Sequence, residues 1–140
     1  MSGAFERTLD ARGWELPKIL LDSDVLIEWL RGHEPSVHRI QALFENHEEL
    51  FWTPVSIAEI FAGVRKGEEA EVANLFLLLE AVSITPEIGR QAGQFLKSYA
   101  KSHAVELGDA LIAACALVEG LSLWTLNRKH YPMTGMEFFS

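Results

Sequence analysis

Short apolar runs alternate along this chain with longer segments of helical periodicity. The first run, Lys18–Leu21, ends abruptly on Asp22, where a helical pattern begins. Parallel strands that are covered on both faces are continuous apolar runs of this kind. We therefore predict strands at 18–21, 50–53, 82–84 and 121–126, with a short edge strand at 137–139.

Between these runs, apolar residues recur at the three- and four-residue spacing of helices with one buried face. We predict helices at 23–31, 35–46, 56–65 and 68–80, from Pro86 onward, and at 109–119. The last of these is apolar on nearly every side, so we expect it to be central. Strands that alternate with helices predict an α/β fold with a mostly parallel sheet and right-handed crossovers.

The chain of 140 residues fits a single domain, and its 49% apolar and 23% charged residues are those of an ordinary globular protein. We expect a leader of unknown role at 1–17 and one domain at 18–140. No uncharged apolar stretch reaches 18 residues, and the leader lacks a signal-peptide core. The sequence therefore predicts a cytoplasmic protein without a membrane segment.

Charge and cysteine content narrow the possible functions. The formal net charge of −8 argues against a general basic surface for nucleic acids, because nonspecific phosphate binding depends on Lys and Arg. It does not exclude a metal-dependent nuclease, whose cation screens its acids. The single cysteine, Cys115, lies in an Ala-rich apolar segment, so we expect it to be a core residue.

Three acidic residues stand beside apolar stretches, namely Asp22, Glu59 and Asp109. Carboxylates are seldom fully buried unless they are paired or bound to a metal. If the strand ends gather them at one sheet edge, two charges 4 Å apart would repel by about 4 kcal/mol at an effective dielectric near 20. Such a cluster needs a cation, and Mg²⁺ or Mn²⁺ suits hard oxygen ligands.

Each acid also has a purely structural interpretation, which the sequence leaves open. Asp22 or Ser23 could cap the helix that follows, and the same holds for Asp109 in the last helix. The segment from Ser56 to Glu59 has the spacing of a capping box, in which a serine and a glutamate satisfy free helix amides reciprocally. Asp24 is similarly expected to be a capping residue.

Four segments carry a family resemblance. They are Asp-Ser-Asp-Val-Leu-Ile from residue 22, Val-Ser-Ile-Ala-Glu-Ile-Phe-Ala-Gly from 55, Leu-Gly-Asp-Ala-Leu-Ile-Ala-Ala from 107 and Thr-Leu-Asn-Arg-Lys-His-Tyr from 125. In this order they resemble the PIN-domain ribonucleases of the VapC toxin type, over residues 18 to about 139. The resemblance implies a PIN-like α/β/α sandwich with a mostly parallel central sheet. It also implies a Mg²⁺-dependent endoribonuclease, with Mn²⁺ as a possible substitute.

The resemblance also implies roles for individual residues. The catalytic and metal-binding acids would be Asp22, Glu59 and Asp109, supported by the hydroxyls of Ser23 and Thr125. In the last motif many relatives carry a further acid, whereas this chain has Asn127, which we interpret as a supporting or turn residue. Candidate RNA contacts are Arg128, Lys129 and His130, for which a solvated turn is the alternative.

Partners follow from the same resemblance. VapC-like toxins are similar in pairing with a VapB-type antitoxin, whose terminal segment lies in a groove and occludes an acidic site, and in forming homodimers. The helices at 23–31, 35–46 and 56–80 could build that groove. Two alternatives remain: a catalytically weak or inactive PIN-fold protein that only binds RNA or a partner, and a haloacid-dehalogenase-like phosphatase using Asp22 and Asp24.

Overall fold

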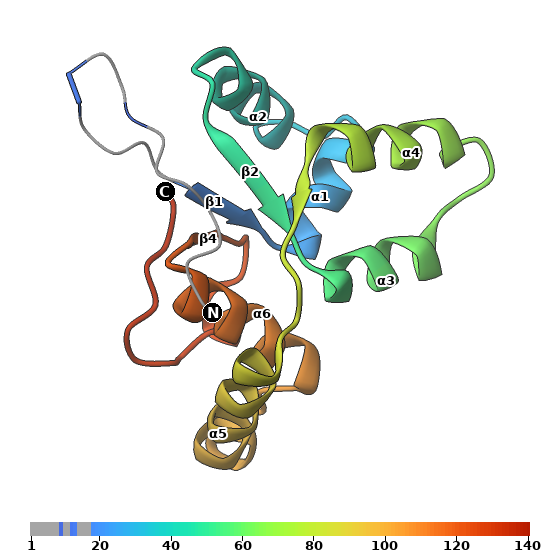
Figure 1. Cartoon of the computed structure of the whole chain (residues 1–140). Coiled ribbons are helices and arrows are strands. Elements are labelled where there is room, and N and C mark those ends of the chain that lie inside the picture. Colours follow the sequence, from blue (N-terminus) through green and yellow to red (C-terminus); the bar gives the residue numbers. More distant parts are fainter. Residues whose placement is uncertain (1–8, 10–11, 14–17) are drawn as a thin grey trace.

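Four parallel strands form the central sheet of the computed structural model, which describes residues 9, 12–13 and 18–140 (Figure 1). The predicted leader therefore lies almost wholly outside the described residues. The strands are β1 (Lys18–Leu21), β2 (Glu49–Trp52), β3 (Glu80–Ala81) and β4 (Ser122–Trp124), in the spatial order β3-β2-β1-β4. Every pair is parallel, so the strands end at the same edge of the sheet.

The register between β1 and β4 determines what meets at that edge. Leu21 pairs with Trp124, and the Asp22 amide continues the pairing by donating to the Trp124 carbonyl at 2.9 Å. The residues that follow these strands, Asp22 and Thr125, therefore lie next to one another, although 103 positions separate them in the chain.

Helices cover both faces of the sheet (Figure 1). They are α1 (Ser23–Leu30), α2 (Ser36–Glu45), α3 (Pro54–Gly63), α4 (Glu69–Leu78), α5 (Pro86–His103) and α6 (Leu107–Glu119). Strand side chains alternate between two apolar clusters. Leu20 packs with residues of α5 and α6, whereas Ile19 and Leu21 pack with residues of α1 to α4. The predicted α/β/α sandwich is confirmed.

Helix α6 is the central helix that its composition predicted. Six of its residues are buried, among them Cys115 with no exposed surface. Burial raises the pKa of the Cys115 thiol to about 12, with Glu119 adding to the effect. Cys115 is therefore a core residue, as expected. No helix among the described residues is both long enough and apolar enough to cross a lipid bilayer.

Two strand predictions are wrong, one in position and the other in extent. The predicted strand at 82–84 instead occupies Glu80–Ala81, and only the Val82 amide still bonds to the sheet, at 2.9 Å from the Trp52 carbonyl. Both residues of β3 are exposed at the sheet edge, so hydrophobicity does not mark them. The predicted edge strand at 137–139 is reduced to one parallel bridge between Leu123 and Phe138.

Candidate active site

Five carboxylates line one cavity of about 490 Å³ beyond the strand ends. All three predicted acids are among them, and the full set is Asp22, Asp24, Glu59, Glu106 and Asp109. Asn127 and His130 from the last motif also line this cavity. The fold thus brings the four sequence motifs to one place, which in open α/β sheets is where ligands bind.

Asp22 is held most firmly of these acids. It is 8% exposed and is the N-cap of α1, where Oδ1 accepts a hydrogen bond from the Ser23 amide at 2.8 Å. Its Oδ2 accepts two further hydrogen bonds, from the Thr125 hydroxyl and the Tyr131 phenol, both at 2.8 Å. The capping and the site interpretations of Asp22 are therefore compatible, because one carboxylate performs the cap and faces the cavity.

The hydroxyl of Ser23 connects α1 to Glu59 on α3. Ser23 Oγ lies 2.8 Å from Glu59 Oε1 and 2.9 Å from Ser56 Oγ. A hydroxyl has a single proton to donate. When Ser23 donates to the charged Glu59, Ser56 therefore donates to Ser23. This chain of hydrogen bonds fixes Glu59 at the cavity although its helix belongs to a different part of the sequence.

The capping box predicted at Ser56 and Glu59 is wrong. Helix α3 begins two residues earlier, at Pro54, and its cap is Thr53, whose Oγ1 accepts from the Ser56 amide at 3.2 Å. Proline at the first helical position has the required φ and needs no amide partner, which favours this earlier start. Ser56 is consequently inside the helix and fully buried. Its side chain and that of Glu59 are thereby available to Ser23.

Asp109 is in the first turn of α6, where it forms a capping box with Glu106. Its Oδ2 accepts from the Glu106 amide at 3.2 Å, while Oδ1 lies 3.9 Å from His130 Nδ1. Burial raises the pKa of Asp109, the Glu106 amide and His130 counteract this, and Asp22 adds to the increase. The Asp22 and Asp109 carboxylates therefore repel one another, and a cation bound between them would reduce this repulsion.

Asp24 does more than the capping role expected from the sequence. Oδ1 accepts from the Val25 amide at 2.7 Å, and Oδ2 accepts from the Leu126 amide at 3.1 Å, across to the segment after β4. Burial and, second, the charge of Asp22 raise the pKa of Asp24 from 3.8 to about 6. Asp24 therefore joins α1 to the last motif, although burial and the charge of Asp22 disfavour its ionised form.

The last motif forms a turn at the cavity wall, with a short 3₁₀ helix at Arg128–His130. Asn127 Nδ2 lies 3.0 Å from His130 Nε2. An amide nitrogen only donates, so this contact makes Nε2 the acceptor and puts the ring proton on Nδ1, toward Asp109. Of the three candidate RNA contacts, only His130 lines the cavity. Arg128 stacks over Phe138 at 4.8 Å and donates to Ser140 Oγ at 3.0 Å.

Sequence reasoning gave no role to Tyr131 or Glu106. Tyr131 is 3% exposed, and burial, followed by the charge of Asp22, raises the pKa of its phenol, which therefore stays protonated and donates. A tyrosine in an apolar setting needs a partner for its hydroxyl, which was the available signal. Glu106 carried no such signal, because a capping box normally has Ser or Thr at the N-cap and Glu or Gln three residues later, whereas here the pair is Glu106 and Asp109.

The donor set fits a hard divalent cation. It consists of carboxylate oxygens, with the Asn127 side chain beside them. Within residues 9, 12–13 and 18–140, no three Asp, Glu, His or Cys side chains form a ready-made metal site. Mg²⁺ keeps several of its waters and is commonly held by one or two carboxylates. Asp22 and Asp109 could supply these two carboxylates, and Glu59 could reach the ion through a water molecule.

Comparison with known proteins identifies a family and close relatives. Residues 19–134 match the family model of the PIN domain. The chain is 40% identical over 116 residues to Ribonuclease VapC10 of Mycobacterium tuberculosis, which covers 82% of this chain and 86% of that protein. It is 32% identical over 115 residues to Ribonuclease VapC19 of the same organism, which covers 81% of this chain and 92% of that protein.

Solved structures share the fold at lower identity. The chain resembles a DNA-bound VapBC from Salmonella typhimurium with a TM-score of 0.73 and 20% identity, covering 89% of this chain and 98% of that one. It resembles VapBC2 from Rickettsia felis, bound to a promoter DNA fragment, with a TM-score of 0.71 and 19% identity, covering 86% and 96%. At these identities the likeness concerns the fold alone.

Proposed function

This chain belongs to the PIN-domain family, and we propose that it is a Mg²⁺-dependent endoribonuclease, the toxin of a VapBC-type toxin–antitoxin system. The carrying observation is that Asp22, Glu59 and Asp109, from three separate motifs, line one cavity at the strand ends. The names of the two mycobacterial relatives support the same activity. The family membership replaces the phosphatase interpretation of Asp22 and Asp24.

In this proposal the carboxylates of the chain would hold and orient the cation, and the cation would supply positive charge at the cavity. The chemistry that Mg²⁺ would supply when bound is activation of a water and compensation of negative charge on a phosphodiester. Asp22 and Asp109 each have one oxygen engaged by a backbone amide, which limits their rotation at the cavity. Glu59 is held through the Ser23 hydroxyl. Positioning of this kind is most of what a protein contributes to phosphoryl transfer.

RNA is the proposed substrate despite the acidic cavity. A phosphate would be repelled by the five carboxylates that line this cavity, so its approach depends on the cation and on nearby donors. His130 is the candidate RNA contact that lines this cavity, where its Nδ1 lies 3.9 Å from Asp109 Oδ1. Arg128 and Lys129 remain predicted contacts to the RNA backbone outside the cavity.

A VapB-type antitoxin is the proposed protein partner, and the cytoplasm the proposed location. Another cavity, of about 190 Å³, lies between α1 and α4. Its wall is mostly apolar, with Trp29, Leu30, Leu75 and Leu78, and also includes Glu71 and Asn74. An apolar segment of a partner would fill this cavity, and a basic residue of the same partner would be attracted to the acidic cavity. This cavity supports the part of the predicted groove that involves the helices at 23–31 and 56–80, whereas the helix at 35–46 supplies none of its lining.

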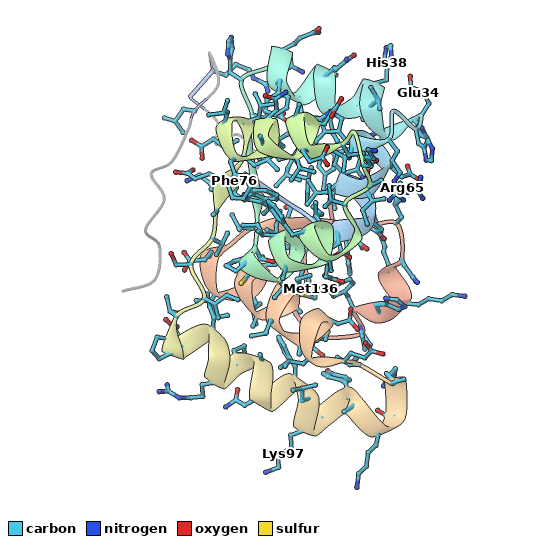
Figure 2. The ribbon with its side chains drawn as sticks, turned by 90° about the vertical axis from the view of Figure 1, so that its right-hand side faces the viewer. Glu34, His38, Arg65, Phe76, Lys97 and Met136 are labelled. Atoms are coloured by element: carbon cyan, nitrogen blue, oxygen red, sulfur yellow. The ribbon has the colours of Figure 1, made fainter. Side chains whose placement is uncertain are left out.

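We also propose that the toxin forms a homodimer through α3 and α4. Phe61 and Phe76 are each 50% exposed and contact one another, and the neighbouring Leu77 is 84% exposed. Figure 2 shows Phe76 on the side of α4 that is turned toward α3. Contiguous exposed apolar side chains of this kind are typical of protein interfaces. A second copy of the chain would cover them.

Total RNA and the partner-free protein provide the test. We expect discrete cleavage with Mg²⁺ and none with EDTA, and we expect Asp109→Asn to abolish cleavage while the circular dichroism spectrum stays unchanged. Asp22→Asn should behave in the same way. Glu87→Gln is the matched control, because it removes one charge from an exposed residue of α5.

Each result leads to a definite conclusion. Full activity in Asp109→Asn would exclude this cavity as the active site. Absence of cleavage by the folded wild-type protein would favour the alternative function, a catalytically weak or inactive PIN-fold protein. In that case a filter-binding assay should show RNA or partner binding without turnover.

A further inference from the structure

The phenol of Tyr131 reaches the first acid of the candidate site directly. Its hydroxyl donates to Asp22 Oδ2 at 2.8 Å, 109 positions away in the chain. Thr125 donates to the same oxygen at 2.8 Å. Both donors are buried, with 3% and 8% of their surface exposed. The oxygen is therefore engaged by two hydroxyl groups that water does not easily displace.

Counting lone pairs shows what this arrangement does to Asp22. A carboxylate oxygen presents two acceptor positions in the plane of the group. The two hydroxyls occupy both positions on Oδ2, whereas the Ser23 amide is the one donor to Oδ1 among the residues that the structure describes. Asp22 consequently has one acceptor position left, and it is on Oδ1.

The hydroxyl of Thr125 is itself oriented. The backbone amide of Asn127 donates to Thr125 Oγ1 at 3.1 Å, which leaves the single proton of this hydroxyl for a carboxylate. The shorter contact is to Asp22 Oδ2 at 2.8 Å, against 3.4 Å to Asp24 Oδ2. Tyr131 needs no such help, because its aromatic ring is packed in the core cluster with residues of α5 and α6. Phenylalanine would fill the same space, so packing alone does not account for the hydroxyl.

We propose that Tyr131 is a positioning residue. Together with Thr125 it fixes the Asp22 carboxylate so that only the Oδ1 atom is presented to the cation. This inference rests on the proposed metal-dependent function. Residues that orient metal ligands through hydrogen bonds typically change metal affinity or activity 10- to 100-fold when they are replaced. Loss of the Tyr131 hydroxyl should therefore weaken cation binding without disturbing the RNA contacts.

Isothermal titration of the full-length protein with MgCl₂ tests this inference, without RNA and without turnover. We expect Tyr131→Phe to bind Mg²⁺ about 10- to 100-fold more weakly than wild type. The chain has two tyrosines, and Tyr99→Phe is the matched control. Its hydroxyl lies at the surface, 3.4 Å from Thr134 Oγ1, so its removal should leave the affinity within about twofold.

The Mg²⁺ dependence of kcat is a second measurement, and it would not change if Tyr131 had only a structural role. The lower kcat of Tyr131→Phe should recover toward the wild-type value as Mg²⁺ is raised, with an unchanged KM for RNA. In an Asp22→Asn background, Tyr131→Phe should change Mg²⁺ affinity no further, because the oriented carboxylate is already absent. A folded Tyr131→Phe protein with wild-type Mg²⁺ affinity would overturn the inference and leave the proposed function intact.

Two further outcomes are separable. If Tyr131→Phe does not fold, Thr125→Val removes the other donor to Oδ2 and should show the same loss of affinity, while Thr125→Ser should retain binding. Wild-type affinity in Thr125→Val would then overturn the inference. Wild-type protein that binds no Mg²⁺ and cleaves no RNA would overturn both the proposed function and the role of Tyr131.

Discussion

The raised pKa of Asp24 predicts that the protein loses stability as pH increases through the weakly acidic range. The pKa of this carboxyl is about 6 in the folded protein, against 3.8 for the ordinary group, because of burial and the nearby charge of Asp22. Between these two values the folded protein holds a proton that the unfolded chain has released. Stability therefore decreases as pH rises through this interval, and the loss is complete above about pH 6.

The magnitude follows from the size of this difference. At 1.36 kcal/mol per pH unit, the full effect is about 3 kcal/mol, of which ~2 falls between pH 4.5 and 7.5. Asp24 is only partly buried, so solvent screening reduces the observable part to about 1 kcal/mol. For a domain of this length that corresponds to a shift of roughly 2 to 4 °C in Tm.

Thermal unfolding of wild type and Asp24→Asn at pH 4.5 and 7.5 measures this effect. Burial raises the pKa values of Asp109 and Glu48 as well, so the wild-type pH dependence alone does not identify Asp24. The informative quantity is the change in Tm between the two pH values, which should be smaller by about 2 to 4 °C in Asp24→Asn. EDTA in all samples removes any contribution from bound cations.

The absolute stability of Asp24→Asn does not enter this comparison. Asparagine has one acceptor oxygen and cannot reproduce the bonds to both the Val25 and the Leu126 amides. That loss applies at both pH values and cancels in the difference. Glu87→Gln, which removes an exposed charge, should keep the wild-type pH dependence. The same pH dependence in Asp24→Asn as in wild type would refute the reasoning.

Two other changes test the support of the site and the proposed homodimer. Ser23→Ala should lower the free energy of unfolding by about 1 to 3 kcal/mol in urea titrations, because the fully buried Ser56 hydroxyl loses its partner, and it should impair cleavage, because Glu59 is no longer held at the cavity. The exposed Ser98→Ala should stay within about 0.5 kcal/mol, and an equal effect of both would contradict this role of Ser23. Leu77→Gln should leave Tm nearly unchanged but weaken self-association in sedimentation velocity, since Leu77 is 84% exposed. A dimer of undiminished strength would exclude this face.

Local signals predicted most of the fold, and they failed where a segment is at the edge of the sheet or where two start signals compete. The exposed strand β3 has no apolar signature, so the prediction moved to the more apolar segment after it, in which only Val82 is buried. At α3, the Ser56–Glu59 spacing suggested a cap, but Pro54 and Thr53 begin the helix earlier. Both errors arise because tertiary position decides which of several local signals is used.

The order of strands and helices along the chain, the central helix α6 and three of the five acids of the cavity were predicted from the sequence itself. Their physical basis is local, since hydrophobic periodicity reports which face of each element is buried. The hydrogen bonds at the site depend instead on the tertiary structure. Tyr131 and Thr125 meet Asp22 only because Leu21 pairs with Trp124 in the parallel sheet. Separations of more than a hundred residues leave no local pattern, so the donors to Asp22 and the oxygen left free for a cation become visible only in the folded chain.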